Sequence, residues 1–230
     1  MRHEAKDRYV RRLLRKRDFV GITEAHVLEG VAVAWSCPSD CRCWFSPGTQ
    51  RRAGVGLVVK LDFLKQFDAP RREDWIETVP GRAAVLRLRG PAGALDLHIA
   101  YFATGTRGLV TPRSTDPTVR TVDADVPDDL DDEEMPDVQD EPAAVGVRRQ
   151  RAGMRRAMAA SMAPQSEVLS IVTGDFNWVV RQEDRVSLAT GLPAEDRDAD
   201  EERDAAATLW RPHGLYELRQ DEPTHEQAGC

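Results

Sequence analysis

The stretch VLSIVTGDFN, residues 168–177, decides the fold of this chain. Its apolar first half, followed by glycine and polar residues, predicts a buried β-strand. Side chains two positions apart in an extended backbone point the same way, so we expect Asp175 and Asn177 to project together from the strand end. Phe176, which lies between them, should then turn into the core. Taken alone, the Asp-Phe-Asn triplet is more typical of an Asx turn after a strand.

The acid and the amide form a pair that suits phosphate chemistry. Asp175 can orient or deprotonate a water molecule, and Asn177 can donate to a phosphate oxygen. A second apolar segment, DFVGITEAH at 18–26, predicts another buried strand that delivers Glu24 at its end. Taken singly, Glu24 is also compatible with a solvated loop acid. Together the two strand ends suggest a site for Mg²⁺, which binds through one or two carboxylates plus substrate phosphate.

Hydrophobic periodicity predicts the remaining elements. They are an N-terminal helix with an apolar stripe at residues 9–14, a strand at 55–60, a hairpin of strands at 82–89 and 94–101, a helix at 147–163 with methionines at 154, 158 and 162, and a short helix at 205–210 closed by a glycine cap at 214. The methionine stripe is far more typical of a core than of a cofactor site. The elements indicate an α/β protein with a single domain over residues 1–230.

The formal net charge of −7 is unevenly distributed along the chain. Residues 121–142 hold eleven acids and no Lys or Arg, so the rest of the chain carries +4. Such an acidic run buries too little apolar surface to offset its ordering entropy, and we predict a disordered insertion at 106–146 and an acidic mobile loop at 191–204. The basic remainder can meet a polyanion, although Arg-rich helix faces are usually only solvated.

The cysteines and histidines do not indicate a metal site. Cys37, Cys41 and Cys43 cluster without a neighbouring histidine and without the spacing of common zinc sites. We therefore expect them to be free thiols in a surface loop. His98 is expected on the exposed face of the hairpin, as a surface residue and not as a ligand.

The sequence carries no sign of membrane insertion or secretion. No apolar run approaches the ~20 residues that a membrane helix needs. The N-terminus has no apolar stretch followed by a cleavage site, so we expect no signal peptide and an intracellular location, nuclear or cytoplasmic. Nothing in the sequence indicates the oligomeric state.

Four sequence blocks, in order, carry a family resemblance. They are DFVGITEAH at 18–26, GVGLVVK at 54–60, LHIAYFATG at 97–105 and VTGDFNWVVRQEDR at 172–185. They resemble the endonuclease/exonuclease/phosphatase family, the deoxyribonuclease-like and AP-endonuclease-like enzymes, whose signatures are similar to DIIGLQETH, GGVAILVK, L.L.NVYAP and GGDFN. The similarity is closest to the endonuclease domain of non-LTR retrotransposons, in which GDFN is followed by a stretch ending in Asp-Arg. The resemblance spans about residues 8–225.

The resemblance implies a four-layer α/β/β/α sandwich of the deoxyribonuclease-like type, with the active site at one edge of two packed sheets. It implies a hydrolase that cleaves phosphodiester bonds of nucleic acid, DNA above all, with Mg²⁺ as cofactor and Mn²⁺ as an alternative. Glu24 would ligate the metal, and Tyr101 would hydrogen-bond the scissile phosphate or a nearby acid. Asp175 would activate the attacking water, and Asn177 would hold a phosphate oxygen. The residues that would line the site are His26 and Asp184.

The chain also departs from the family pattern. The family begins with a strand that carries a metal-site Asn, and it ends with a strand carrying an Asp, followed by Ser-Asp-His with a general acid/base histidine. Neither the first strand with its Asn nor the last strand with the Ser-Asp-His that follows it is recognisable here, and His225 does not match that histidine. The resemblance therefore implies a domain that is incomplete at both ends. Two alternatives stay open: a catalytically impaired fragment or binding module on the same fold, or an enzyme for another phosphoester such as an inositol phosphate, sphingomyelin or poly(A).

Overall fold

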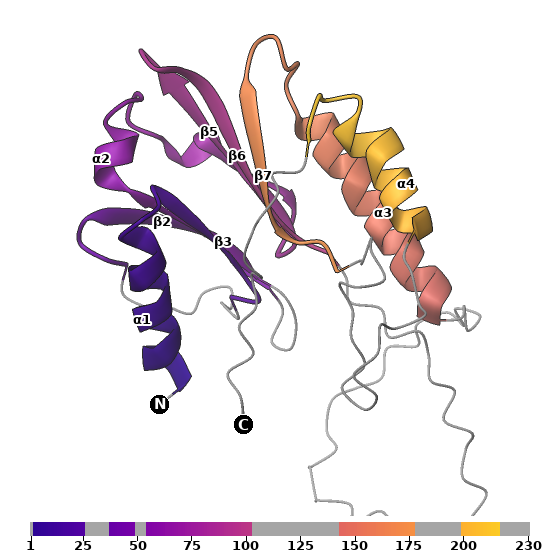
Figure 1. Ribbon diagram of the computed structural model, residues 1–230, viewed down its shortest axis with the longest axis horizontal. Helices are drawn as coiled ribbons and strands as arrows, with labels where there is room; N and C mark the ends of the chain where they lie inside the picture. Colours follow the sequence, from indigo (N-terminus) through magenta and orange to yellow (C-terminus); the bar gives the residue numbers. More distant parts are fainter. Residues whose placement is uncertain (1, 26–36, 49–53, 103–142, 178–198, 217–230) are drawn as a thin grey trace, which may run out of the picture.

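The computed structural model describes residues 2–25, 37–48, 54–102, 143–177 and 199–216. Within these residues the chain forms two β-sheets that face each other, with helices on their outer sides (Figure 1). Two of the predicted site-lining residues, His26 and Asp184, lie outside the described residues, as does most of the predicted acidic insertion.

The first sheet is antiparallel and three-stranded, in the order β1-β3-β2. The elements of this half are α1 (Arg2–Leu14), β1 (Phe19–Thr23), β2 (Cys41–Ser46), β3 (Val55–Lys60) and α2 (Leu61–Leu64). Helix α1 covers the outer face, where Val10 and Leu14 join the buried Val58. Tyr9 is 45% exposed, so the buried stripe of this helix is narrower than the sequence predicts.

The second sheet has four strands, in the order β4-β5-β6-β7. Its elements are the 3-10 turn η1 (Arg72–Asp74), β4 (Trp75–Val79), β5 (Ala83–Gly90), β6 (Gly93–Tyr101), β7 (Leu169–Asp175), α3 (Ala143–Ser161), α4 (Ala199–Ala205) and the π-helical η3 (Ala206–Trp210). The predicted hairpin is confirmed, because β5 and β6 pair in antiparallel register up to Gly90 and Gly93. Strand β7 then adds parallel to β6.

Helices α3 and α4 cover the outer face of this second sheet (Figure 1). The methionine stripe lies in the core, as predicted: Met154, Met158 and Met162 are all buried and pack with Phe102 and Leu209. Because helical side chains three and four positions apart share one face, three methionines at this spacing cover the sheet continuously. The predicted glycine cap is also present, since Gly214 adopts a φ of +62°.

The inner faces of the two sheets form the central core. Leu57 and Val59 of β3 meet Leu86, Leu88 and Leu97 of the second sheet, and all five are fully buried. With α1 on one side and α3 on the other, these contacts confirm the predicted four-layer α/β/β/α sandwich.

The two sheets approach each other closely at Gly21 in β1. A Cβ atom there would lie 2.7 Å from Ile99 Cδ1 and 2.9 Å from Thr173 Cγ2, closer than packed carbon atoms tolerate. Strand β1 therefore rests directly on β6 and β7. This approach brings the end of β1 beside the ends of the two strands that carry the other predicted site residues.

The cysteine prediction is wrong. A disulfide joins Cys37 to Cys43, and Cys41 is a buried thiol at the start of β2. The reason is a tight turn, in which the Cys41 N–H donates to the Pro38 carbonyl at 2.9 Å and reverses the chain. Burial raises the pKa of the Cys41 thiol to about 11, so it stays protonated at neutral pH.

Three further expectations differ from the structure. His98 is 1% exposed, because β6 is a central strand and α3 covers the face on which this side chain lies. Helix α3 begins at Ala143, so residues 143–146 are helical and do not belong to the predicted insertion. Residues 199–204 likewise lie in α4 and not in a mobile loop.

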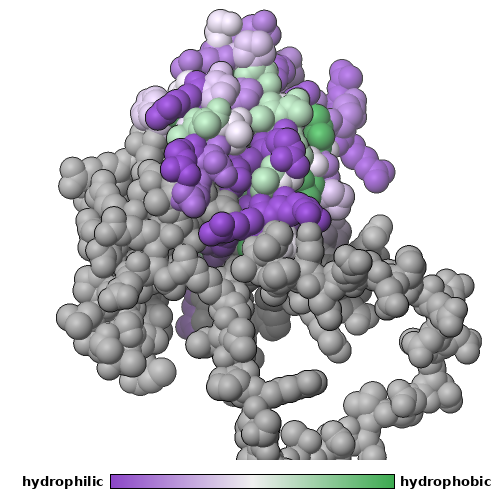
Figure 2. Space-filling view, turned by 90° about the vertical axis from the view of Figure 1, so that its right-hand side faces the viewer, coloured by the Kyte–Doolittle hydropathy of each residue, from purple (hydrophilic) through white to green (hydrophobic). Residues whose placement is uncertain are grey.

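The surface over α3 and α4 is mostly hydrophilic, with small hydrophobic patches between the polar side chains (Figure 2). The exposed residues of α3 include Arg148, Arg149 and Arg156. In the described part of the chain no helix has the length and apolar character needed to cross a membrane.

Candidate active site

The ends of three strands meet at one edge of the sandwich. Glu24 directly follows β1, Tyr101 ends β6, and Asp175 ends β7 as the parallel partner of Tyr101. The Tyr101 hydroxyl donates a short hydrogen bond to Glu24 Oε1, which joins the two sheets. Three of the four residues predicted to act in the reaction are therefore neighbours, although Glu24 and Tyr101 stand 77 residues apart in the chain.

A glycine allows β7 to reach this edge. Gly174 has a φ of +147°, and a Cβ atom at this position would lie 1.9 Å from the carbonyl oxygen of Ala100. Only glycine fits such an approach without displacing the backbone. The glycine of the GDFN motif thus brings Asp175 directly beside Tyr101.

Two of the predicted site residues have a left-handed backbone. Glu24 has a φ of +52° and Asn177 a φ of +54°, and among the described residues no other non-glycine residue has a positive φ. This conformation costs about 1–2 kcal/mol for a residue such as glutamate, whereas asparagine tolerates it more readily. Strained backbone that survives in a fold is concentrated at functional sites. Both outliers here flank the same cluster of side chains.

Asn177 is held by three hydrogen bonds. Its N–H donates to Asp175 Oδ1 at 3.0 Å, its Nδ2 donates to the Phe102 carbonyl at 2.8 Å, and its carbonyl accepts from Arg151 Nη2 at 2.6 Å. The first bond is the Asx turn that the triplet alone suggests. The prediction of a shared direction for Asp175 and Asn177 in extended backbone is wrong, because the strand ends at Asp175 and Asn177 is left-handed.

Phe176 turns inward, as predicted. Its ring centroid lies 5.6 Å from that of Phe102 and 5.5 Å from that of Trp210. This aromatic contact ties the turn after β7 to the outer helices, so the polar residues on either side are anchored by core packing.

The surroundings of Tyr101 keep its hydroxyl protonated. Burial raises the pKa of Tyr101 first, and the hydrogen bond to Glu24 raises it further. The charge of Asp175 adds to this shift, whereas the guanidinium of Arg82, with its carbon 4.8 Å from the ring centroid, opposes it. Tyr101 is therefore a neutral hydrogen-bond donor between two carboxylates at neutral pH.

Comparison with known families agrees with this geometry. The family model described as Endonuclease/Exonuclease/phosphatase family matches residues 2–221. The chain belongs to the endonuclease/exonuclease/phosphatase family. A comparison with curated proteins gave no match. This family comprises hydrolases of the phosphodiesterase and nuclease type, which generally depend on a divalent metal and act on phosphoesters, often in nucleic acids.

The oxygen donors of the candidate site fit a hard divalent cation of the kind that this family uses. Glu24 and Asp175 supply carboxylates, and each has a second oxygen beyond the one that accepts the hydrogen bond described above. Mg²⁺ needs only one or two carboxylates because it retains waters and binds substrate phosphate. Within the described residues no three His, Cys, Asp or Glu side chains are grouped closely enough to form a complete metal cage.

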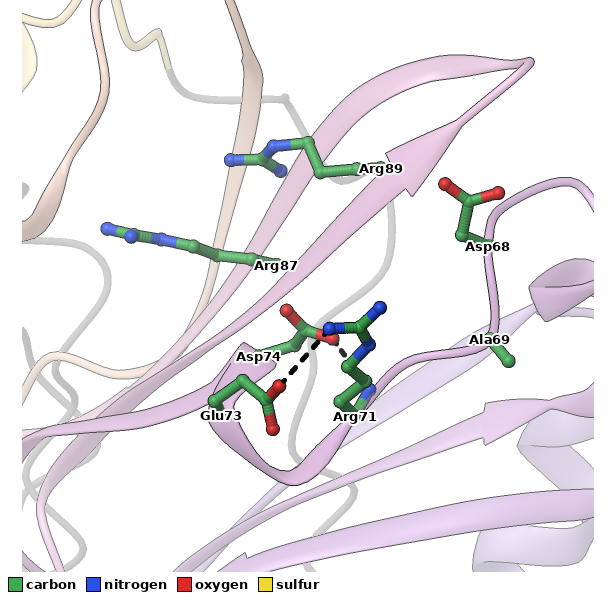
Figure 3. A pocket seen from close by; sticks show the side chains of 7 residues that line it. All are labelled: Asp68, Ala69, Arg71, Glu73, Asp74, Arg87 and Arg89. Carbon is green, nitrogen blue, oxygen red and sulfur yellow. Dashed lines mark hydrogen bonds and ion pairs between the residues drawn. The ribbon is translucent and has the colours of Figure 1, made fainter.

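A pocket of about 220 Å³ lies elsewhere, at the opposite end of β5 from Tyr101 (Figure 3). Arg87 and Arg89 line it, and both are held by the fully buried Asp96, whose carboxylate lies 2.7 Å from Arg89 Nη1 and 3.7 Å from Arg87 Nε. The other lining residues are Asp68, Ala69, Arg71, Glu73 and Asp74. Because none of the candidate site residues lines it, this pocket is distinct from the candidate active site.

Sequence reasoning missed three residues that shape the site: Gly21, Arg82 and Arg151. The sequence does contain a signal for Arg151. This arginine precedes Met154 by three residues, so it lies on the same face of α3 as the apolar stripe. A charged residue on a buried helix face needs a partner, and Arg151 finds one in the carbonyl of Asn177. The contact between Arg82 and Tyr101 joins the turn before β5 to the end of β6, and local periodicity does not reveal it.

Proposed function

We propose that this chain is a divalent-metal-dependent phosphodiesterase that hydrolyses nucleic acid, with DNA as the preferred substrate. The observation that carries the proposal is the hydrogen bond from Tyr101 to Glu24, made across the two sheets beside Asp175. The spacing of GDFN and a following Asp-Arg, similar to retrotransposon endonucleases, favours DNA over other phosphoesters.

Each residue has a role that its surroundings support. Glu24 would hold Mg²⁺, or Mn²⁺ in its place, and the bound cation would neutralise charge on the phosphate. Tyr101 orients the Glu24 carboxylate through its hydroxyl. Asp175, fixed by the N–H of Asn177, is suited to orient a water molecule and accept its proton. The Asn177 side chain, bonded through Nδ2 to the Phe102 carbonyl, has one further N–H for a phosphate oxygen.

Plasmid nicking tests this proposal. The wild type should nick supercoiled DNA with Mg²⁺ and lose this activity in EDTA. Asp175→Asn and Glu24→Gln should each lower the rate by about 10²-fold or more, because each removes a group that acts in the reaction. The matched controls are Asp68→Asn and Glu73→Gln, exposed acids of the remote pocket, which should leave the rate unchanged.

The outcomes separate the alternatives. Nicking that survives both active-site substitutions would show that these residues do not carry the reaction. Salt-dependent DNA binding without nicking would identify a binding module on the same fold. Hydrolysis of an inositol phosphate, sphingomyelin or poly(A), with no action on DNA, would retain the chemistry and change the substrate class.

A further inference from the structure

Arg82 lies against Tyr101 at the edge of the candidate active site. The Tyr101 N–H donates to the Arg82 carbonyl at 2.7 Å, which fixes the end of β6 to the turn residue just before β5. The Arg82 side chain then folds over the ring, with its guanidinium carbon 4.8 Å from the ring centroid. Backbone and side chain thus both hold Arg82 against the residue that hydrogen-bonds Glu24.

The contact with the Tyr101 ring does not by itself provide a hydrogen-bond acceptor for the guanidinium of Arg82. All five N–H donors of an arginine lie in the plane of the group, so packing on an aromatic ring satisfies none of them. Nη1 of Arg82 is buried and has no hydrogen-bond partner in the part of the chain that the structure describes. Buried donors in native proteins are rarely left without an acceptor, and an exception calls for a ligand or another explanation.

The charge around Tyr101 indicates which acceptor suits this donor. Glu24 and Asp175 both act on the Tyr101 hydroxyl and both raise its pKa, so the cluster is rich in carboxylates. A phosphate that approaches them needs positive charge nearby, and Arg82 supplies it from the same ring. The planar fork of arginine matches phosphate oxygens, and this match makes the residue effective in phosphate recognition.

We propose that Arg82 is a phosphate-binding residue of the active site. Its guanidinium, positioned over the Tyr101 ring, donates to a non-bridging oxygen of a substrate phosphate. This inference rests on the proposed function for the identity of the substrate, a phosphodiester of DNA. Tyr101 consequently has two contacts with different roles: its hydroxyl orients Glu24, and its ring positions Arg82.

The salt dependence of DNA binding tests the proposal without any need for cleavage. Affinity for a short fluorescein-labelled duplex is measured by fluorescence anisotropy in EDTA over a range of salt concentrations. One lost phosphate contact should reduce the slope of log K against log salt by about 0.9. Arg82→Ala should show this reduction, whereas Arg82→Lys should keep the slope because it retains a positive charge.

Arg42 provides a matched control. Its guanidinium carbon lies 5.0 Å from the Trp44 ring centroid, but its Nη1 already donates to the Pro70 carbonyl at 2.7 Å. It pairs with Val59 in the ladder, towards the end of β3 remote from the strand end that precedes Glu24. Arg42→Ala removes the same charge from a similar position over an aromatic ring and should leave the slope unchanged.

Nicking by the same proteins in Mg²⁺ separates this inference from the proposed function. A lowered slope in Arg82→Ala alone supports the inference, even if the wild type cleaves nothing. Wild-type cleavage combined with an unchanged slope in Arg82→Ala overturns the inference and leaves the function intact. An equal reduction of the slope in Arg42→Ala also overturns the inference, because the loss of any positive charge would then have the same effect. Circular dichroism checks that each variant is folded, and Arg82→Gln, a second variant without the charge, should show the same reduced slope if the alanine variant does not fold.

Discussion

His98 is a buried histidine among charged neighbours in the second sheet. Burial lowers its pKa from 6.5 to about 4, and the nearby Arg87 and His213 act in the same direction, against the opposing effect of Asp96. Its Nε2 is buried and has no hydrogen-bond partner among the residues that the structure describes. The folded protein therefore holds this imidazole neutral under conditions in which an unfolded chain would protonate it.

This shift predicts a pH-dependent stability. Between pH 6.5 and about 4 the unfolded chain binds a proton at His98 that the folded chain does not, so the free energy of unfolding should fall as the pH is lowered through this window. The contribution is on the order of 3 kcal/mol in full. Urea unfolding at a series of pH values should show a shallower dependence in His98→Gln than in the wild type. Parallel curves would contradict the assignment, and His98→Asn offers a second neutral variant if glutamine does not fit.

Some features of the site residues could be predicted from the local sequence, and others could not. The inward turn of Phe176 was predictable, because an aromatic between two polar residues at a strand end has one apolar direction available. The left-handed backbone of Asn177 was not, since period-two alternation applies only while the strand continues. The hydrogen bond between Glu24 and Tyr101 depends on how two sheets pack, and no local pattern contains that information.

At the scale of elements, strand β2 is held at its start by the Cys37–Cys43 disulfide. Sequence spacing did not reveal this bond, because pairing depends on the turn that folds Cys37 back over the strand. Cys41 lies between the two but is a poor nucleophile, since its buried thiol stays protonated. The disulfide is therefore protected from exchange with the neighbouring cysteine.

Reduction of this disulfide should lower stability. A bond that closes a short loop restricts the unfolded chain and contributes about 2 kcal/mol. Thermal unfolding of the wild type should occur at a lower temperature with dithiothreitol than without it. The double variant Cys37→Ser/Cys43→Ser should unfold like the reduced wild type and should not respond to dithiothreitol. A wild-type melting temperature that is insensitive to the reductant would show that the bond adds nothing to stability.

The elements themselves were largely predictable from periodicity. The β5–β6 hairpin alternates in the sequence and forms as predicted, and the methionines of α3 lie on the buried face of that helix. The sequence predicts a loop where β2 forms, because the cysteines and tryptophan of this strand match no alternating pattern. The acidic composition of residues 199–204 favours a loop, whereas the structure forms α4 there, with Ala205 at its end and Leu209 of η3 fully buried.

At the scale of the whole molecule, the site exists only because two sheets are pressed together at one edge. Glu24 belongs to the first sheet, whereas Tyr101 and Asp175 belong to the second. The order of strands in each sheet could not be predicted from periodicity, and the resemblance to a family supplied the layered arrangement. The packing of Gly21 against the second sheet therefore affects where Glu24 lies relative to Tyr101 and Asp175.

Enlarging Gly21 should accordingly disturb both stability and activity. An added Cβ atom would lie 2.7 Å from Ile99 and 2.9 Å from Thr173, so Gly21→Ala has to push β1 away from the second sheet or displace these side chains. Such overpacking costs about 1–3 kcal/mol. The shift would also lengthen the Tyr101–Glu24 contact, so nicking should slow by more than the loss of folded protein explains. Urea unfolding and nicking of the folded fraction measure the two effects.

Gly153 in α3 is the matched control for this change. A Cβ atom there meets nothing within 4 Å, so Gly153→Ala should stabilise the helix by about 0.5–1 kcal/mol and leave nicking unchanged. The comparison separates a general effect of glycine replacement from an effect at the sheet interface. If Gly21→Ala unfolds like the wild type and nicks at the wild-type rate, then the close approach of the sheets does not set the position of Glu24. The site would in that case depend on the strand ends alone, and the left-handed backbone at Glu24 would be the next feature to change.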